Sequence, residues 1–196
     1  MTGSFFALIS RMRHIRRWGL MRNSIEENIQ EHSHMTAVLA HALALIRRDI
    51  FGLEADPERA ATAALYHDAS EIMTGDMPTP VKYFNGNISG AYKEVEKTAV
   101  GQLLNLLPKE LRGSYSELLD CQDETTRALV KAADKLSAYI KCVEELRAGN
   151  NEFSSAEKQI RAVLEASPLP EVKYFMEHFM ASFGMTLDEL TAGEAD

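Results

Sequence analysis

An imidazole and a carboxylate are adjacent at His67 and Asp68, late in an alanine-rich segment. If this segment is helical to about Ile72, then Ala64, His67 and Glu71 fall within about 60° of one another, with Asp68 beside them. The alanines indicate that this is the buried face. Buried polar groups need partners, and a divalent cation accepts both a neutral imidazole and a carboxylate. The dipeptide alone is a weak signal, because His and Asp at the end of a helix can also cap neighbouring groups.

Of the histidines nearer the N-terminus, His32 is the one that the helical pattern places inward. Apolar residues at positions 35, 38, 39, 42, 43 and 46 have the i, i+3, i+4, i+7 spacing of an amphipathic helix. His32 lands about 60° from Met35 on the apolar side, whereas His34 and His41 project away from it. We therefore expect His32 to face the interior. His34 and His41 are expected either at the surface or in contact with the metal ligands rather than with the metal itself.

Asp134, in the stretch LVKAADKLSAY, is the natural fourth ligand, but the helical pattern does not select it. It lies about 120° to 140° from the centre of the apolar stripe that runs from Leu129 to Val143. Periodicity alone therefore predicts a surface aspartate. A metal site lodged between helices could use that flank, but this interpretation needs support from outside the pattern.

The segments that must position these side chains are all predicted to be helical. No alternation with a period of two is long enough to suggest a sheet. Asp56 and Pro57 form an N-cap followed by proline at the first helical position, whereas Gly75–Pro80 is expected to be a stiff, non-helical loop. We predict a single all-α domain over residues 1–196, with helices at about 31–50, 57–72, 91–107, 110–119, 124–147, 153–166 and 170–182.

Composition limits the classes of function. Hydrophobic residues make up 45% of the 196 residues and charged residues 26%, as in a globular protein. No apolar run approaches the roughly 18 residues that span a bilayer, and the N-terminal FFALI run is too short for a signal peptide. A cytoplasmic location without a membrane partner is therefore expected. The formal net charge of −8 disfavours a nucleic-acid polymer as partner.

The charge is unevenly spread along the chain. The first 25 residues hold no Asp or Glu, but they include arginines at positions 11, 13, 16, 17 and 22. This segment could bind a small anion, and a solvated basic helix face explains it equally well. Cys121 and Cys142 belong to no CxxC pair and are expected to be small buried residues rather than metal ligands.

The order His32, His67-Asp68, Asp134 resembles the H…HD…D motif of the HD phosphohydrolase superfamily. Longer segments resemble one branch of it, the bacterial 5′-deoxynucleotidase family, and they span much of the chain from about residue 5 to about residue 190. The stretch at 65–84 is long enough to be specific. The resembling segments are RRWGLMRN at 16–23, ENIQEHS at 27–33, LYHDASEIMTGDMPTPVKYF at 65–84, KAADKLSAYIKC at 131–142 and EELRAGNNEF at 144–153.

The resemblance implies an HD-domain helical bundle with one divalent metal ion between its core helices. Its ligands would be four residues that all match the motif, and the ion would be of the Co, Mn, Fe or Mg class because mixed N and O ligands suit six-coordination. The implied substrate is a deoxyribonucleoside 5′-monophosphate, cleaved to the deoxyribonucleoside and phosphate, and the implied assembly is a homodimer. The implied ligands are His32, His67, Asp68 and Asp134.

The resemblance also implies roles around the substrate. Arg17 would clamp the phosphate and Trp18 would pack against the sugar, although Trp18 could instead be a core or rim aromatic. The residue after Trp18 is Gly19, where we expect proline. Glycine in this place is expected to loosen the loop that carries Arg17 and Trp18. Thr79 and Lys82 could contact the base or the phosphate.

Glu71 and Asp76 match the catalytic carboxylates of the family. Glu71 would orient water or act as a general base, and Asp76 would protonate the leaving 5′-oxygen. The reverse division stays open, as does a simple turn role for Asp76 after Gly75.

Other functions remain as alternatives. Another HD phosphohydrolase could act on nucleoside triphosphates or other nucleotides, and a non-catalytic nucleotide-binding scaffold is a further alternative. Alarmone hydrolases carry a second acid where this chain has Ile72. Two-metal cyclic-nucleotide enzymes need further histidines, whereas only His178 follows Asp68 along the chain. Both of these variants are disfavoured.

Overall fold

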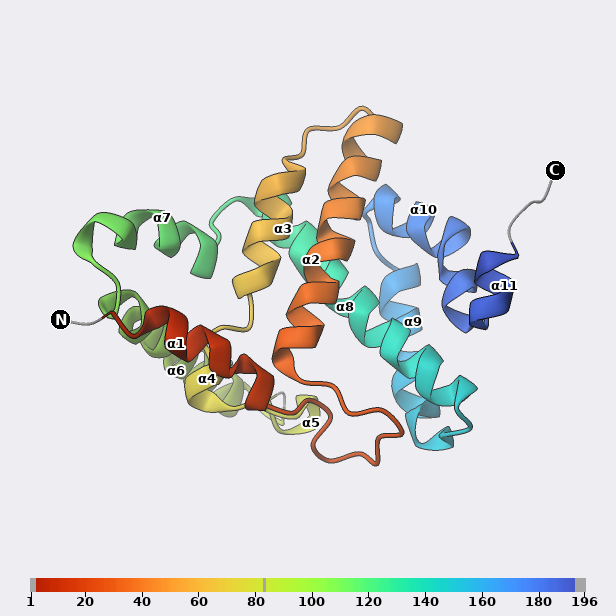
Figure 1. Ribbon diagram of the computed structural model, residues 1–196, viewed down its shortest axis with the longest axis horizontal. Coiled ribbons are helices and arrows are strands. Elements are labelled where there is room, and N and C mark those ends of the chain that lie inside the picture. Colours follow the sequence, from red (N-terminus) through yellow and green to blue (C-terminus); the bar gives the residue numbers. More distant parts are fainter. Residues whose placement is uncertain (1–2, 83, 193–196) are drawn as a thin grey trace.

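The computed structural model describes residues 3–82 and 84–192, and their regular structure is helical, as predicted (Figure 1). In these residues, backbone pairing between extended segments is limited to one isolated bridge, between Arg16 and Asn28. The α-helices are α1 (Phe5–Ile9), α2 (Ile29–Leu45), α3 (Pro57–Tyr66), α4 (Glu71–Thr74), α5 (Thr79–Lys82), α6 (Gly86–Asn105), α7 (Lys109–Leu119), α8 (Glu124–Arg147), α9 (Ser154–Glu165), α10 (Pro170–His178) and α11 (Leu187–Thr191). Shorter helical turns cover Ser10–His14, Ile46–Ile50, Asn151–Phe153 and Met180–Gly184.

The centre of the molecule is formed by α2, α3 and α8. Figure 1 shows α2 and α3 side by side, with α8 crossing behind them. Alanines line the contacts, and the large side chains between them, such as Leu43 and Leu136, are fully buried. Each buried leucine stabilises the fold by about 1.5–3 kcal/mol. Small residues let the three backbones approach closely, which brings together polar side chains from the start of α2, from just after α3 and from the middle of α8. The alanines of this core include Ala40, Ala44, Ala60, Ala63, Ala64 and Ala133.

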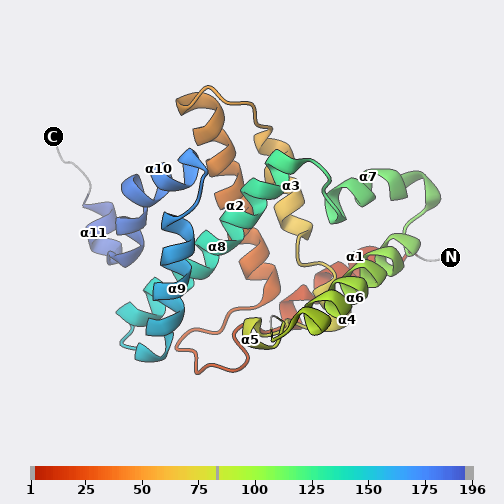
Figure 2. The same ribbon diagram turned by 180° about the vertical axis from the view of Figure 1, so that it is seen from behind.

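A second, smaller core lies beside the first. It joins α1, α6 and α7 to the segment that follows α3, and its buried members are Phe5, Ala69, Leu103, Leu107 and Leu119. Figure 2 shows α6 lying next to α1 at one end of the molecule, whereas α9, α10 and α11 form the other end. Among the described residues, no helix combines the length and apolar character needed to cross a bilayer.

Local sequence explains where the central helices begin. Asn28 accepts a hydrogen bond from the backbone N–H of Glu31 at 3.0 Å, and Glu31 accepts one from the N–H of Asn28 at 3.3 Å. This capping box starts α2 at Ile29, two residues before the predicted start. Asp56 caps α3 as predicted, accepting from the N–H of Arg59 at 2.9 Å. The predicted helix at 124–147 is confirmed as α8.

The prediction of one helix from residue 57 to residue 72 is wrong. The α-helix ends at Tyr66, tight turns follow, and a new short helix begins at Glu71. In a continuing helix the carbonyl of Ala64 would accept from the N–H of Asp68. Here it accepts from Nδ1 of His67 at 2.7 Å. The backbone then tightens into i to i+3 bonds, such as Glu71 N–H to Asp68 O at 3.0 Å.

Other boundaries also differ from the predictions. Residues 79–82 form the single turn α5, because Pro80 is accommodated in the first turn of a helix. The next helix begins at Gly86 rather than 91, since Asn85 caps it by accepting from the N–H of Ile88 at 2.9 Å. The helix predicted over 170–182 ends at His178. Val38, placed on the apolar stripe of α2, is 51% exposed.

Candidate metal centre and phosphate site

His32, His67 and Asp68 form a cluster at the end of the central helices. One ligand atom from each lies within 4.8 Å of the others, and the two imidazole centroids are 5.3 Å apart. His32 comes from the first turns of α2 and is fully buried, as predicted, whereas His34 is exposed. His67 and Asp68 come from the turn that ends α3. These residues are thus brought together by the contact between α2 and α3.

Asp134 of α8 joins this cluster, although periodicity alone made it a surface aspartate. Its Oδ1 lies 3.1 Å from Nε2 of His32. The side chain sits on the flank of α8, and α8 crosses α2 so that this flank faces the histidine. Although burial acts in the opposite direction, the contact with His32 holds the pKa of Asp134 far below its usual range. The four residues of the H…HD…D motif therefore meet at one place.

The donor atoms of both histidines suit a metal ion. Nδ1 of His67 donates to the carbonyl of Ala64, which leaves the buried Nε2, 3.2 Å from Oδ2 of Asp68, to hold either a second proton or a metal ion. Nδ1 of His32 lies 3.1 Å from the hydroxyl of Ser137. Nε2 of His32 then faces two carboxylates, at 3.1 Å from Asp134 and 3.7 Å from Asp68. An imidazole lone pair and a carboxylate oxygen repel each other unless a proton or a cation lies between the two atoms. These residues therefore fit a divalent metal.

Charge is concentrated strongly in this cluster. Burial alone would lower the pKa of His67, but Asp68 and Asp134 raise it to about 9. Burial alone would raise the pKa of Asp68, but His67 and His32 lower it to about 2. The cluster therefore binds positive charge tightly, whether as protons or as a metal ion.

Glu71 lies beside the cluster and is a buried carboxylate. Burial first, and then the charges of Asp68 and Asp76, raise the pKa of Glu71 to about 9. Its Oε2 has no hydrogen-bond partner among the described residues. Asp76 is partly buried, and burial raises its pKa, whereas Arg17 and the backbone N–H of Trp18 oppose that shift. Two carboxyl groups with raised pKa values thus lie close to the predicted ligands.

Arg17 reaches the cluster from the segment that precedes α2. Its Nη1 lies 3.3 Å from Oδ2 of Asp68, and its side chain is 12% exposed. Although burial disfavours its charge, Asp68 and Glu27 raise the pKa of Arg17, so the guanidinium remains charged. A planar cation next to a metal site suits the binding of a phosphate.

Trp18 follows with a backbone φ of 59°, a left-handed conformation that is rare for a bulky residue. Its ring centroid lies 5.2 Å from that of Phe153, and its Nε1 donates to Oε2 of Glu27 at 2.9 Å. Gly19, which stands where we expect proline, removes the restriction that proline would place on the backbone of Trp18. Trp18 is thus a partly buried residue held by specific contacts.

Sequence reasoning missed Glu27, Lys141 and Glu145. The two oxygens of Glu145 accept from the backbone N–H groups of Ser24, at 2.9 Å, and Ile25, at 3.1 Å, and Lys141 contacts both Glu145 and the carbonyl of Ile25. This buried ion pair ties the loop after Trp18 to α8. No periodicity marks any of the three. Glu27 acts through bonds to Arg17 and Trp18 across a loop, whereas Lys141 and Glu145 act through the contact of that loop with a distant helix.

The predicted contacts of Thr79 and Lys82 with substrate stay predictions. Thr79 is exposed at the start of α5. The ammonium group of Lys82 lies 2.8 Å from Glu96 of α6 and 4.7 Å from the ring centre of Tyr92.

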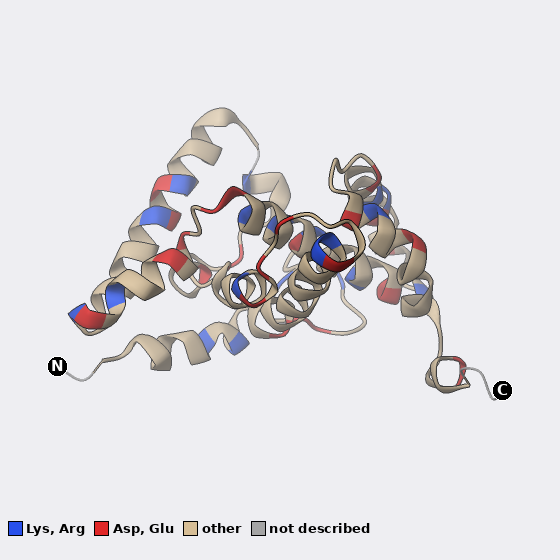
Figure 3. Cartoon of the chain, turned by 90° about the horizontal axis from the view of Figure 1, so that it is seen from above, with Lys and Arg blue, Asp and Glu red and all other residues tan. Residues whose placement is uncertain are grey.

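Cys142 is buried, as expected, whereas Cys121 is only partly buried, and both are free thiols. The basic N-terminal segment carries Arg11, Arg13 and Arg16 on its exposed surface, and no acidic residue lies on its first helix (Figure 3). Arg17 is the member of this segment that turns toward the cluster.

Comparison with known proteins agrees with this arrangement. A family described as 5′-deoxynucleotidase YfbR-like matches residues 4–183. The chain is 50% identical over 189 residues to 5′-deoxynucleotidase YfbR of Escherichia coli, covering 95% of each chain. It is also 50% identical over 187 residues to a 5′-deoxynucleotidase of Shewanella oneidensis, covering 94% of this chain and 96% of that one.

Among solved structures, an HD-domain phosphohydrolase from Listeria innocua has a TM-score of 0.80 at 24% identity, covering 96% of this chain and 95% of that one. The HD phosphohydrolase DatZ of cyanophage S-2L, solved with dA and one catalytic Zn²⁺ ion, has a TM-score of 0.63 at 23% identity. That match covers 92% of this chain and 96% of that one. These likenesses identify the fold as that of HD-domain phosphohydrolases.

Proposed function

Because the chain belongs to the YfbR-like 5′-deoxynucleotidase family, we propose that it hydrolyses deoxyribonucleoside 5′-monophosphates to deoxyribonucleosides and phosphate. The observation that carries this proposal is the 3.3 Å contact between Nη1 of Arg17 and Oδ2 of Asp68. A phosphate held by Arg17 would lie directly beside the predicted ligands. This is the placement that attack of water on a phosphate monoester requires.

The divalent ion would be held by the two imidazoles of His32 and His67 and by the carboxylates of Asp68 and Asp134. When bound, such an ion supplies Lewis-acid chemistry by lowering the pKa of water and polarising phosphoryl oxygens. We propose an ion of the Co, Mn, Fe or Mg class, since two imidazoles and two carboxylates are a mixed N and O set.

The chain's own residues do the remaining work. Arg17 neutralises charge on the phosphate, using the part of its guanidinium that the protein leaves available. Its Nε contacts Glu27 and its Nη1 contacts Asp68, and within residues 3–82 and 84–192 no protein acceptor bonds Nη2. Stabilising charge that develops in the transition state is worth on the order of 100-fold or more in rate.

Glu71 and Asp76 divide the proton transfers. Glu71 lies deep beside Asp68, and we assign to it the orientation or deprotonation of the attacking water. A cation bound at Asp68 would offset the negative charge that raises the pKa of Glu71 and so favour its carboxylate form. Asp76 faces Arg17 and the backbone of Trp18, which are the residues expected to hold phosphate and sugar. We therefore assign to the Asp76 carboxyl the proton that is given to the leaving 5′-oxygen.

The function is tested by measuring phosphate release from deoxyribo- and ribonucleoside 5′-monophosphates. The metal-free protein would be reloaded separately with Co²⁺, Mn²⁺, Fe²⁺, Mg²⁺ or Zn²⁺. We expect release that depends on metal and is faster with the deoxy substrates. Trp18→Ala should raise the relative rate with ribonucleotides, because the wall beside the sugar is lost. Pyrophosphate or tripolyphosphate release from triphosphates, or no turnover with any metal, would contradict the proposal.

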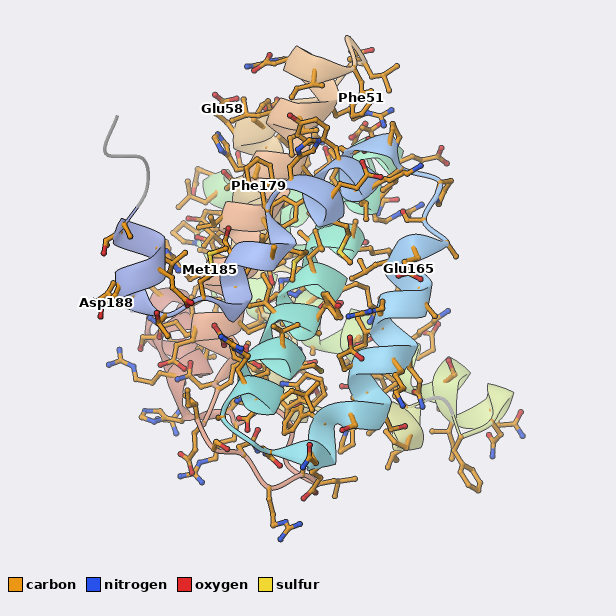
Figure 4. All side chains as sticks on the ribbon, turned by 90° about the vertical axis from the view of Figure 1, so that its right-hand side faces the viewer. Phe51, Glu58, Glu165, Phe179, Met185 and Asp188 are labelled. Carbon is orange, nitrogen blue, oxygen red and sulfur yellow. The ribbon has the colours of Figure 1, made fainter. Side chains whose placement is uncertain are left out.

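We also propose a homodimer. Of the C-terminal aromatics, Phe175 belongs to the core, whereas Phe179 is 44% exposed. Phe179 shares the face shown in Figure 4 with Phe51, which is 39% exposed, and with Met185. Light scattering on the wild type and on Phe179→Asp tests this proposal, because a charge at a dimer contact should shift the mass toward the monomer.

A further inference from the structure

One carboxylate oxygen holds the side chains of both Arg17 and Trp18. Oε2 of Glu27 accepts from Nε of Arg17 at 3.2 Å and from Nε1 of Trp18 at 2.9 Å. The side chain of Glu27 is only 15% exposed. Its other oxygen lies 3.9 Å from Nδ1 of His32, on the side of the ring away from Asp134. Glu27 thus lies between the substrate-binding candidates Arg17 and Trp18 and the predicted metal ligands without belonging to either set.

The backbone places Glu27 opposite Arg17 at the neck of a loop. The N–H of Arg17 donates to the carbonyl of Glu27 at 2.9 Å, and the N–H of Ile29 donates to the carbonyl of Ile15 at 3.0 Å. These bonds fix where the two segments meet. They do not fix where the guanidinium of Arg17 and the indole of Trp18 point, because both side chains extend beyond the backbone bridge between Arg16 and Asn28. The carboxylate of Glu27 restrains both orientations.

Trp18 needs such a restraint because its backbone is in an unfavourable region. A left-handed φ is strained for a residue with a side chain, so the conformation of Trp18 depends on contacts elsewhere. Its side chain donates a hydrogen bond to Glu27 and packs against Phe153. Without the carboxylate, a partly buried indole N–H would lose its acceptor, and rotation of the ring would become favourable.

Arg17 depends on Glu27 in a different way. Its other side-chain partner is Asp68, which is also a predicted metal ligand. Glu27 is therefore the carboxylate that Arg17 does not share with the metal.

We propose that Glu27 is a positioning residue, which holds the Arg17 guanidinium and the Trp18 indole in one arrangement and so couples phosphate binding to sugar discrimination. This inference rests on the proposed function of those two residues. Glu27 would act only through them and would not touch the reacting atoms.

The test compares Glu27→Ala and Glu27→Gln with Glu26→Ala as a matched control. Glu26 is the neighbouring glutamate, and it pairs with Arg16 at the exposed surface. Trp18 is the only tryptophan of the chain, so fluorescence emission and anisotropy report its environment without any assay of activity. In Glu27→Ala we expect shifted emission and lower anisotropy of Trp18. The Gln variant keeps an acceptor oxygen and should lie between Ala and the wild type.

The kinetic readout separates positioning from chemistry. In Glu27→Ala the KM for a deoxyribonucleoside monophosphate should rise by about tenfold, as expected when hydrogen bonds to a charged group are lost. The change in kcat should be smaller, and the preference for deoxy over ribo substrates should fall. Glu26→Ala should match the wild type in every measurement.

The inference is overturned if Glu27→Ala leaves the emission of Trp18 and the sugar preference unchanged, or if only kcat falls. Should the Ala variant fail to fold, wild-type values for Glu27→Gln in all readouts would overturn it as well. Failure of the proposed function is a separate result, namely no phosphate release by the wild type. The fluorescence comparison would still test the contact in that case.

Discussion

The guanidinium of Arg17 and the carboxylate of Asp68 are in contact, with Nη1 and Oδ2 separated by 3.3 Å. Arg17 precedes the central helices and Asp68 follows two of them, so the contact joins residues 51 positions apart. A phosphate bound by Arg17 and a cation bound by Asp68 would be neighbours.

Replacing Arg17 should reduce turnover strongly. Arg17→Ala should lower kcat/KM for deoxyribonucleoside monophosphates on the order of 100-fold or more, because a preorganised charge contact is lost. Arg17→Lys should lower it less, since an ammonium keeps the charge but not the planar fork. Phosphate-release kinetics measure both effects. Arg16→Ala is the control, because Arg16 is exposed, and wild-type kinetics of Arg17→Ala would contradict the prediction.

Metal affinity should increase with pH. The pKa of His67 is raised to about 9 in the metal-free protein, so at neutral pH this ring holds a proton that a metal must displace. Calorimetric titration with Mn²⁺ in buffers of different ionisation enthalpy should reveal proton release, and binding should tighten as the pH rises toward that pKa.

Asp134→Asn should weaken this binding, whereas His34→Gln should not, because His34 is exposed and apart from the cluster. Chelation should abolish activity and added metal should restore it. Affinity that is independent of pH, without proton release, would count against the ligand assignment.

Glu71→Gln should stabilise the metal-free protein while reducing activity. The pKa of Glu71 rises from an ordinary 4.5 to about 9, so between these values the folded state binds a proton that the unfolded state has lost. Stability therefore falls as pH rises through this window, and glutamine removes the effect. Thermal unfolding should show a gain in Tm that is larger at pH 8 than at pH 5.

The gain should amount to a few degrees, since about 1 kcal/mol shifts Tm by roughly 2–4 °C in a domain of this size. Glu165→Gln serves as the control, because Glu165 is exposed on α9. A lower Tm for Glu71→Gln at pH 8 would show that the buried Glu71 carboxyl does not destabilise the folded protein.

Asp76→Asn should change the alkaline limb of the pH–rate profile. If the Asp76 carboxyl protonates the leaving oxygen, activity is lost as pH rises through its pKa, which burial raises. Asparagine cannot donate that proton, so the rate should fall and this limb should disappear. A near-normal rate with an unchanged limb would remove Asp76 from the mechanism. Asp120→Asn, at an exposed position, is the control.

Local sequence predicted much of the helical frame. The bounds of α8 agree with the apolar stripe and with Asp123, which caps the helix by accepting from the N–H of Thr126 at 2.7 Å. The inward position of His32 follows from its phase relative to the apolar residues of α2. Both succeed because periodicity and capping depend on residues within a few positions of each other.

The turn at His67 could not be predicted in this way. The pattern of small and polar residues continues through it, so periodicity suggested one helix to residue 72. The helix ends because the ring of His67 bonds the carbonyl of Ala64, which depends on the rotamer of one side chain.

The sequence by itself determined that this chain forms amphipathic helices and carries an H…HD…D set with an inward-facing His32. Only the tertiary structure decided that the flank of α8 turns Asp134 toward His32, and that Glu27 connects Arg17 with Trp18. The reason is physical. Helical phase is set by neighbouring residues, whereas the face that a helix flank or a loop meets is set by how distant helices cross and pack.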